Sequence, residues 1–316
     1  MIRTTGLVKR YGAFTAVDGI DLSIPRGQVY GFLGPNGAGK TSTIMMLLGI
    51  TRPTAGEIRL FGERYTPDRL DLRRRIGVVP EKHPRGVWPW MTARDYLRLF
   101  ADLFEVPDAG KRIETLLAKV DLERSGNKRI REFSHGMLQK LSFIRALLPD
   151  PDILFLDEPI SGLDPLGIKQ VRDLIVSENR EGRTIFISSH QLSEMEKICH
   201  RVAIIFRGKL MVEDTMENLL ARVAPELELR VELAQTPEGA VAGLGALPFV
   251  RGVSGEGATL VVRLSRDADH RRALSEHLIR AGLVPVRIEE KSTSLEEAFI
   301  TITQENVDRL ARGGKA

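Results

Sequence analysis

The residues from Gly34 to Thr41 read Gly-Pro-Asn-Gly-Ala-Gly-Lys-Thr, which matches the phosphate-loop pattern of a glycine, four residues and Gly-Lys-Ser/Thr. The apolar run Val29–Leu33 precedes the loop and predicts a buried strand. The stretch Lys40–Leu48 follows it, predicts a helix and ends at Gly49. Strand, glycine loop and helix are the context that the pattern requires, so this segment constrains the fold more than any other.

The loop chemistry follows from these residue types. Gly37 and Gly39 allow the backbone to turn its N–H groups toward an anion, and the helix N-terminus adds partial positive charge. Lys40 can reach the outer phosphates of a nucleotide, and the Thr41 hydroxyl can ligate Mg²⁺. The alternative is a glycine-rich turn without a ligand. The predicted phosphate-binding residues are Gly34, Pro35, Asn36, Gly37, Ala38, Gly39, Lys40, Thr41 and Ser42.

Composition narrows the class of protein. The 316 residues are 42% hydrophobic and 28% charged, which is typical of a globular chain long enough for one large core and a smaller domain. The net charge of +4 gives no reason to propose a nucleic-acid partner. No apolar run approaches the ~18 residues that cross a bilayer, and Met1–Gly6 holds no signal-peptide core, so a cytosolic location is expected. The single cysteine, Cys199, is expected to be a buried small hydrophobe.

Periodicity predicts an α/β fold over the first two thirds of the chain. Alternating residues from Ile2 to Ile24 predict antiparallel strands, and helical spacing predicts an insertion over 92–149. Strands, helices and a hairpin then alternate, which indicates a mainly parallel sheet. The predicted strands are 57–61, 76–79, 153–156 and 184–188, with a hairpin of 202–206 and 209–213, and the insertion's third helix is 135–148.

A domain boundary is expected near 222–225. Beyond it, strands are predicted at 226–233, 259–264 and 284–288, and a helix at 268–281. The Gly- and Pro-rich segment 236–257 is predicted to be loop, and 311–316 a frayed tail. The segment 225–316 is therefore interpreted as a small α+β domain, with dimer stabilisation or regulation as its expected role.

Two acids end a predicted buried strand. Asp157 and Glu158 follow Ile153–Leu156, and ligands of such sheets bind outside the carboxyl ends of the strands. Asp157 is placed to hold Mg²⁺, and Glu158 can orient and deprotonate an attacking water. The alternative is that both acids cap the following turn.

Three further motifs are weak functional signals when taken alone, but their order along the chain is specific. Phe133-Ser134-His135-Gly136-Met137 precedes the acidic strand, Ser161-Gly162-Leu163-Asp164 follows it, and His190 ends the next strand. With these motifs in sequence, residues 1–222 resemble the ATP-binding subunits of ATP-binding-cassette (ABC) transporters. That resemblance implies a P-loop NTPase core with an antiparallel β subdomain and a helical insertion.

The resemblance also implies roles for individual residues. The ring of Tyr11 would stack on adenine, and His190 would contact the γ-phosphate and position the water. The signature residues Ser134, His135, Gly136 and Met137 would bind the nucleotide held by another subunit, together with Asp164 of the loop that communicates between sites. The catalytic set is then Glu158, His190 and Lys40, and the metal set is Thr41, Asp157 and Glu81.

Two positions depart from the usual motifs of the family. The signature, usually Leu-Ser-Gly-Gly-Gln, contains His135 and Met137 here, and Glu81 replaces a glutamine that ligates Mg²⁺. A carboxylate can ligate the metal but cannot donate a hydrogen bond as an amide does. Both departures, and the C-terminal stretch Ser294–Phe299, resemble the branch that exports substrates through six-helix membrane subunits.

The expected cofactors are ATP and Mg²⁺, and the expected partners are a membrane permease on the cytoplasmic face of the membrane and a second ATP-binding subunit, which a homodimer can supply. No nucleic acid is expected. One alternative is an importer ATPase. The other is a soluble cassette ATPase that acts on DNA or ribosomes, but the single phosphate loop and the absence of coiled-coil heptads in the sequence argue against it. Trp88 or Trp90, in the stretch Val87–Met91, is hypothesised to line a groove for the permease; packing against the insertion's first helix is the alternative.

Overall fold

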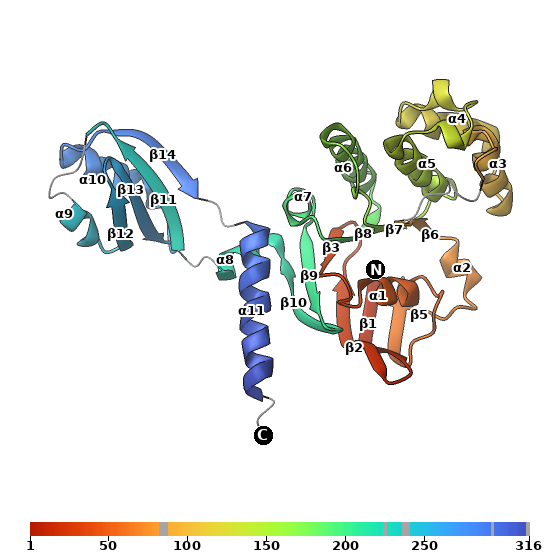
Figure 1. Cartoon of the computed structure of the whole chain (residues 1–316), viewed down its shortest axis with the longest axis horizontal. Coiled ribbons are helices and arrows are strands. Elements are labelled where there is room, and N and C mark those ends of the chain that lie inside the picture. Colours follow the sequence, from red (N-terminus) through yellow and green to blue (C-terminus); the bar gives the residue numbers. More distant parts are fainter. Residues whose placement is uncertain (82–87, 224–225, 236–240, 292–293, 314–316) are drawn as a thin grey trace. The chain divides into compact units, whose positions relative to one another are not determined.

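The computed structural model describes residues 1–81, 88–223, 226–235, 241–291 and 294–313. These residues fall into two compact units, Met1–Met216 and Glu217–Ala316 (Figure 1). The division falls before the position expected from the sequence, 222–225, because helix α8 (Met216–Val223) belongs almost wholly to the second unit. No helix among the described residues is long and apolar enough to cross a membrane.

A six-stranded sheet forms the centre of the first unit, in the order β10-β9-β3-β8-β7-β6. Its strands are parallel except for β10, which pairs antiparallel with β9 in the predicted hairpin. Their bounds are β3 Val29–Leu33, β6 Ile76–Val79, β7 Ile153–Asp157, β8 Thr184–Ser189, β9 Arg201–Phe206 and β10 Lys209–Thr215. Because β3, β8 and β7 are adjacent and parallel, the segments that follow them meet at one edge of the sheet.

The central strands are apolar throughout because both faces of the sheet are covered. Phe186 of β8 lies between Phe32 and Phe155, with ring centroids 5.4 Å and 5.2 Å away. The thiol of Cys199 lies directly against the backbone of Gly31, where an added Cβ would come within 2.9 Å of Sγ. Burial raises the pKa of this thiol, so Cys199 is the buried small hydrophobe that the sequence predicts.

A second, antiparallel sheet has the order β2-β1-β4-β5. It contains β1 (Ile2–Tyr11), β2 (Phe14–Ile24), β4 (Ala55–Leu60) and β5 (Glu63–Arg64). Helix α1 (Lys40–Leu47) shares one hydrophobic core with both sheets, since residues such as Leu7, Ile44 and Phe155 belong to the same buried cluster. The phosphate loop therefore lies between two sheets that fix both of its ends.

The predicted helical insertion is present beside β6. Helix α5 contacts β6, and helices α3, α4 and α5 pack on one another (Figure 1). Besides α1, the described helices of the first unit are α2 Leu70–Arg73, α3 Ala93–Leu103, α4 Ala109–Lys119, α5 His135–Leu147, α6 Pro165–Arg180 and α7 Leu192–Glu196, with 3-10 turns at Glu123–Ser125 and Ile130–Glu132. Thr92 caps α3 and Asp164 caps α6, each by accepting a backbone N–H, and Pro165 is the first residue of α6.

The second unit is an antiparallel sheet in the order β12-β13-β11-β14. Leu274 and Leu278 of its helix α10 are fully buried in a core with the inward residues of the sheet, such as Leu229 and Val262. The elements are β11 Glu226–Leu233, α9 Val241–Gly245, β12 Val250–Glu256, β13 Thr259–Ser265, α10 Arg271–Arg280, β14 Pro285–Lys291 and α11 Leu295–Gly313.

Two predictions for this unit are wrong. The segment 236–257, expected to be loop, contains α9 and β12; residues 236–240 lie outside the described part. The edge strand β12 contains Gly252 and Gly255, and the backbone of Thr259 lies close to Gly255. Glycine in this strand therefore allows the close approach of a neighbouring strand, although its presence in the sequence favours a loop. The expected tail at 311–316 is helical as far as Gly313, and 314–316 are not described.

Candidate functional site

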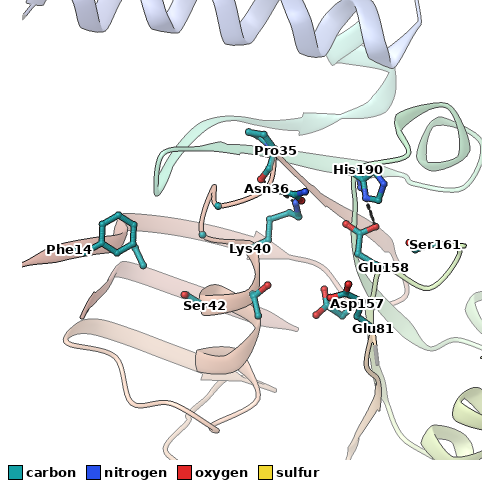
Figure 2. A pocket seen from close by; sticks show the side chains of 14 residues that line it. Phe14, Pro35, Asn36, Lys40, Ser42, Glu81, Asp157, Glu158, Ser161 and His190 are labelled. Atoms are coloured by element: carbon teal, nitrogen blue, oxygen red, sulfur yellow. Dashed lines mark hydrogen bonds and ion pairs between the residues drawn. The ribbon is translucent and has the colours of Figure 1, made fainter. Parts of the chain in front are cut away.

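A cavity of about 330 Å³ opens where the central strands end (Figure 2). The phosphate loop forms one side of it, and Lys40 points from that side toward the acids that follow β7 (Figure 2). Its lining residues are Phe14, Ala16, Pro35, Asn36, Gly37, Gly39, Lys40, Thr41, Ser42, Glu81, Asp157, Glu158, Ser161 and His190. We call this cavity the phosphate pocket.

The ends of the loop are packed too tightly for any residue but glycine. A Cβ at Gly34 would lie 2.4 Å from the carbonyl oxygen of Ile205, and one at Gly39 would lie 2.4 Å from that of Ala16. Gly39 also has φ of 108°, which disfavours other residues. Gly39 is the N-cap of α1, and no side chain caps this helix. The first N–H groups of α1 are therefore available to an anion in the pocket.

Lys40 is nearly buried, and its ammonium is held by the loop itself. Its Nζ donates to the carbonyl oxygens of Gly34, at 2.6 Å, and Pro35, at 3.3 Å. Burial lowers the pKa of Lys40, whereas the charges of Glu158, Asp157 and Glu81 act in the opposite direction. This cation is therefore partly desolvated and lies between the loop and three acids of the pocket.

Asp157 ends β7 and receives a hydrogen bond from the hydroxyl of Ser188 on the adjacent strand. Burial raises the pKa of Asp157, and the hydrogen bond from Ser188 opposes that shift. Glu158 has a similar partner one residue further on, because Ser189 donates to its carboxylate at 3.3 Å. The two serines, for which no sequence motif predicts a role, therefore orient the two acids.

The side chains of Glu158 and His190 are in direct contact in the pocket. Nδ1 of His190 lies 2.9 Å from Oε2 of Glu158, and the His190 backbone N–H donates to the same oxygen at 3.4 Å (Figure 2). Glu158 has φ of 49°, an uncommon left-handed conformation for a glutamate. Its backbone N–H donates to the carbonyl of Ser188, which holds this turn against β8. Such backbone strain is typical of residues positioned for function.

The three predicted metal-binding residues line the same pocket. Thr41 offers a hydroxyl, and Asp157 and Glu81 offer carboxylates, all oxygen donors of the type that Mg²⁺ prefers. The described residues contain no group of three or more His, Cys, Asp or Glu side chains that could hold a metal by themselves. This donor set fits a Mg²⁺ ion that a nucleotide helps to bind, because a threonine and two acids leave about half of the octahedral positions to phosphate and water.

A second cavity, of about 400 Å³, lies between the N-termini of α5 and α6. It contains all five residues predicted to act on another subunit's nucleotide: Ser134, His135, Gly136, Met137 and Asp164. Ser134 accepts the N–H of Met137, and Asp164 accepts that of Gly167, so each side chain caps its helix. None of the five lines the phosphate pocket. We call this cavity the signature pocket.

Comparison with known proteins decides the family. Residues 17–161 match the family model described as ABC transporter. The chain is 43% identical over 232 residues to the bacitracin transport ATP-binding protein BcrA of Bacillus licheniformis, which covers 73% of this chain and 75% of that protein. The chain belongs to the ABC transporter family. This ABC subunit is also 33% identical to the Nod factor export ATP-binding protein I of Ralstonia nicotianae, over 96% and 94% of the two chains.

The fold agrees with the family. A solved structure of the ATP-binding subunit of an ABC transporter matches with a TM-score of 0.64 at 28% identity, over 70% of this chain and 92% of that one. This protein is therefore an ATP-binding subunit of an ABC transporter and an ATPase, built on the mixed α/β fold that the sequence predicts.

Several predicted residues of the ABC subunit lie at the edge of the pocket or behind it. Tyr11 is half exposed and pairs with Phe14 across β1 and β2, yet Phe14, not Tyr11, lines the phosphate pocket. In the sequence, Phe14 shows no signal beyond its place within a predicted strand. Gly34 and Ala38 pack behind the loop, where the carbonyl of Ala38 accepts the N–H of Gly208. The remaining phosphate-loop residues line the pocket as predicted.

The two tryptophans have different surroundings. Trp88 packs on the first helix of the insertion, with ring centroids 5.7 Å from Tyr96 and 5.8 Å from Phe100. Trp90 is 65% exposed. Packing therefore accounts for Trp88, whereas no described residue of the first unit covers Trp90 to the same degree. Val87 lies outside the described residues.

Proposed function

We propose that this chain is the Mg²⁺-dependent ATP-hydrolysing subunit of an exporter, and that two copies act head to tail on a separate membrane permease. The observation that carries this proposal is the division of one site between two pockets. The phosphate loop, both acids and His190 share the phosphate pocket, whereas the five signature-side residues line the signature pocket. A single chain thus holds half of each of two sites.

Binding of ATP follows from the contacts of the phosphate pocket. The N–H groups of the loop and of α1 bind the phosphates, and Lys40 neutralises the outer ones. Thr41, Asp157 and Glu81 would hold Mg²⁺, which supplies charge neutralisation of the phosphates when bound. Phe14 and Tyr11, adjacent on β2 and β1, supply aromatic surface for adenine.

Hydrolysis is assigned to Glu158 and His190. Glu158 orients a water and accepts its proton as the water oxygen bonds to the γ-phosphorus and the bond to the leaving ADP oxygen breaks. His190 holds the Glu158 carboxylate at 2.9 Å and contacts the γ-phosphate. These groups act mainly by positioning and by stabilising charge.

The second copy completes the site. Ser134 and Gly136, at the N-terminus of α5, take the γ-phosphate held by the partner, with His135, Met137 and Asp164 around them. ATP then joins two chains, and hydrolysis releases them. The permease converts this two-state change into substrate movement.

Export is supported by the relatives, one named for Nod factor export and one for bacitracin transport. Glu81 and the altered signature agree with it. We place the subunit on the cytoplasmic face of the membrane through its permease, and we assign the second unit to dimer stabilisation or regulation. The charge of +4 offers no argument for a nucleic-acid partner.

The test is the variant Glu158→Gln in the full chain. It should bind ATP and form a stable dimer, detected by light scattering, while kcat falls by about 10²–10⁴-fold because proton transfer is lost. Adding Ser134→Ala should abolish the ATP-induced dimer without preventing nucleotide binding to the monomer. Normal turnover in Glu158→Gln would overturn the base assignment, and a monomer at saturating ATP would overturn the shared site.

A further inference from the structure

One side chain joins the two pockets, and it occupies the position where the signature motif departs from its usual glycine. Nε2 of His135 lies 3.0 Å from the carbonyl oxygen of Ser161. Ser161 lines the phosphate pocket beside Glu158, whereas His135 lines the signature pocket. The contact therefore connects the first turn of α5 to the loop that follows β7 in the same chain.

The ring and the loop are matched in both chemistry and shape. A carbonyl oxygen only accepts, so Nε2 is the ring nitrogen that carries the proton in this hydrogen bond. The ring also lies over Gly162, which has φ of +71° and where an added Cβ would come 3.3 Å from Nε2. Any other residue at 162 would have a strained backbone, and its Cβ would press against the imidazole.

The loop between Glu158 and Asp164 is short and internally bonded. The N–H of Ser161 donates to the carbonyl of Glu158 at 3.2 Å, and that of Leu163 donates to Ile160 at 3.4 Å. Asp164 then caps α6. Because two successive turns tie the loop together, a displacement of Ser161 reaches the backbone of Glu158, which is already held in an uncommon conformation.

We infer that His135 is a positioning residue that links the two ATP sites of the dimer through its hydrogen bond to Ser161. The inference rests on the proposed function, in which α5 receives the γ-phosphate bound by the partner. When that phosphate fixes the first turn of α5, the His135 ring fixes Ser161 and thereby Glu158 in its own site. A glycine at 135 has no side chain to make this connection.

The first experiment measures steady-state ATPase activity of the full chain against ATP concentration. His135→Leu should lower kcat about tenfold, the effect of losing one hydrogen bond in the transition state, with KM within about twofold. The Hill coefficient for ATP should fall from above 1 toward 1. His135→Gln should recover most of kcat, because its amide nitrogen is as many bonds from Cβ as Nε2 is. His277→Leu, the same change in the second unit, is the matched control.

The outcomes separate this inference from the proposed function. Unchanged kcat and Hill coefficient in His135→Leu, a wild-type Hill coefficient of 1, or a His135→Gln variant no better than leucine would each overturn it. ATP-induced dimerisation is then compared in Glu158→Gln with and without His135→Leu. Equal dimerisation supports positioning within the chain. If only the double variant stays monomeric, His135 acts on the interface or nucleotide and the inference is wrong; if Glu158→Gln alone stays monomeric, the proposed function itself is wrong.

Discussion

The ammonium of Lys119 lies 2.5 Å from a carboxylate oxygen of Glu178, whose side chain is fully buried. Lys119 ends α4 in the helical insertion, and Glu178 lies in α6 of the core, so this ion pair crosses between the two parts of the first unit. Arg183 contacts the other oxygen of Glu178 at 2.8 Å. Because water does not reach this carboxylate, its contacts with the two cations must offset the free energy lost on dehydration.

Glu178→Gln is expected to lower the free energy of unfolding by about 3 kcal/mol, because it removes the buried one of the two anions that Lys119 and Arg183 share and leaves them only the more exposed Glu181 in common. The melting temperature should fall by about 6–12 °C. Thermal unfolding followed by circular dichroism measures this. Lys111→Met, on the exposed side of the same α4, is the control. A loss under about 1 kcal/mol would mean that the pair behaves as a surface salt bridge.

Asp157→Asn should raise the stability of the nucleotide-free protein at neutral pH. Because burial raises the pKa of Asp157, the folded state binds this proton more tightly than the unfolded state does. Stability therefore falls as pH rises from the ordinary aspartate pKa through the raised one, and the full cost is present above it. The variant should melt on the order of 1–3 °C higher at pH 7.5, and its advantage should shrink toward pH 4. A lower melting temperature at pH 7.5 would contradict this assignment.

Phe14→Ala should weaken ATP binding by about 1–2 kcal/mol, or roughly 5–30-fold, through loss of stacking surface for the base. Tyr11→Ala should have an effect in the same direction. Calorimetric titration with ATP and with inorganic triphosphate separates the contribution of the base to binding from that of the phosphates. Neither variant should alter the affinity for triphosphate. If triphosphate binding weakens equally, the aromatic residues support the loop rather than the base.

Trp88→Ala and Trp90→Ala should affect different properties. Trp88 packs against Tyr96 and Phe100, so its loss should cost about 2 kcal/mol of stability. Because Trp90 is exposed, Trp90→Ala should lower the free energy of unfolding by less than about 0.5 kcal/mol. The variant should nevertheless reduce recruitment of the subunit to membranes that contain the permease. Co-sedimentation with such membranes and ATPase assays measure this. Unchanged recruitment and ATPase rate in Trp90→Ala would exclude it from the permease contact.

Elements can be predicted from the sequence where their local residue pattern agrees with their tertiary environment. Residues Ile153–Leu156 of β7 are apolar because both faces of the strand are buried. The parallel pairing of β7 with β8 then brings His190 beside Glu158. The cap of α6 at Asp164 can likewise be predicted from the sequence, because capping depends on a few adjacent residues.

Contacts that depend on side chains from distant segments could not be predicted in the same way. Ser188, Ser189 and Phe14 lack any local signal, and their roles follow only from the pairing of strands. The His135–Ser161 bond likewise joins residues 26 positions apart. The strand β12 was missed because an edge strand with two glycines has the composition of a loop.

The burial of Cys199 against Gly31 has a practical consequence. It is the only cysteine of the chain, and its thiol is both covered and held in the unreactive protonated form. The wild-type protein therefore serves as its own cysteine-free background. A cysteine introduced on the exposed face of α6, for example at Asp173, which lies outside both pockets, would be the single site that takes a spin or fluorescent label, and distances between labels on two copies would report opening and closing directly.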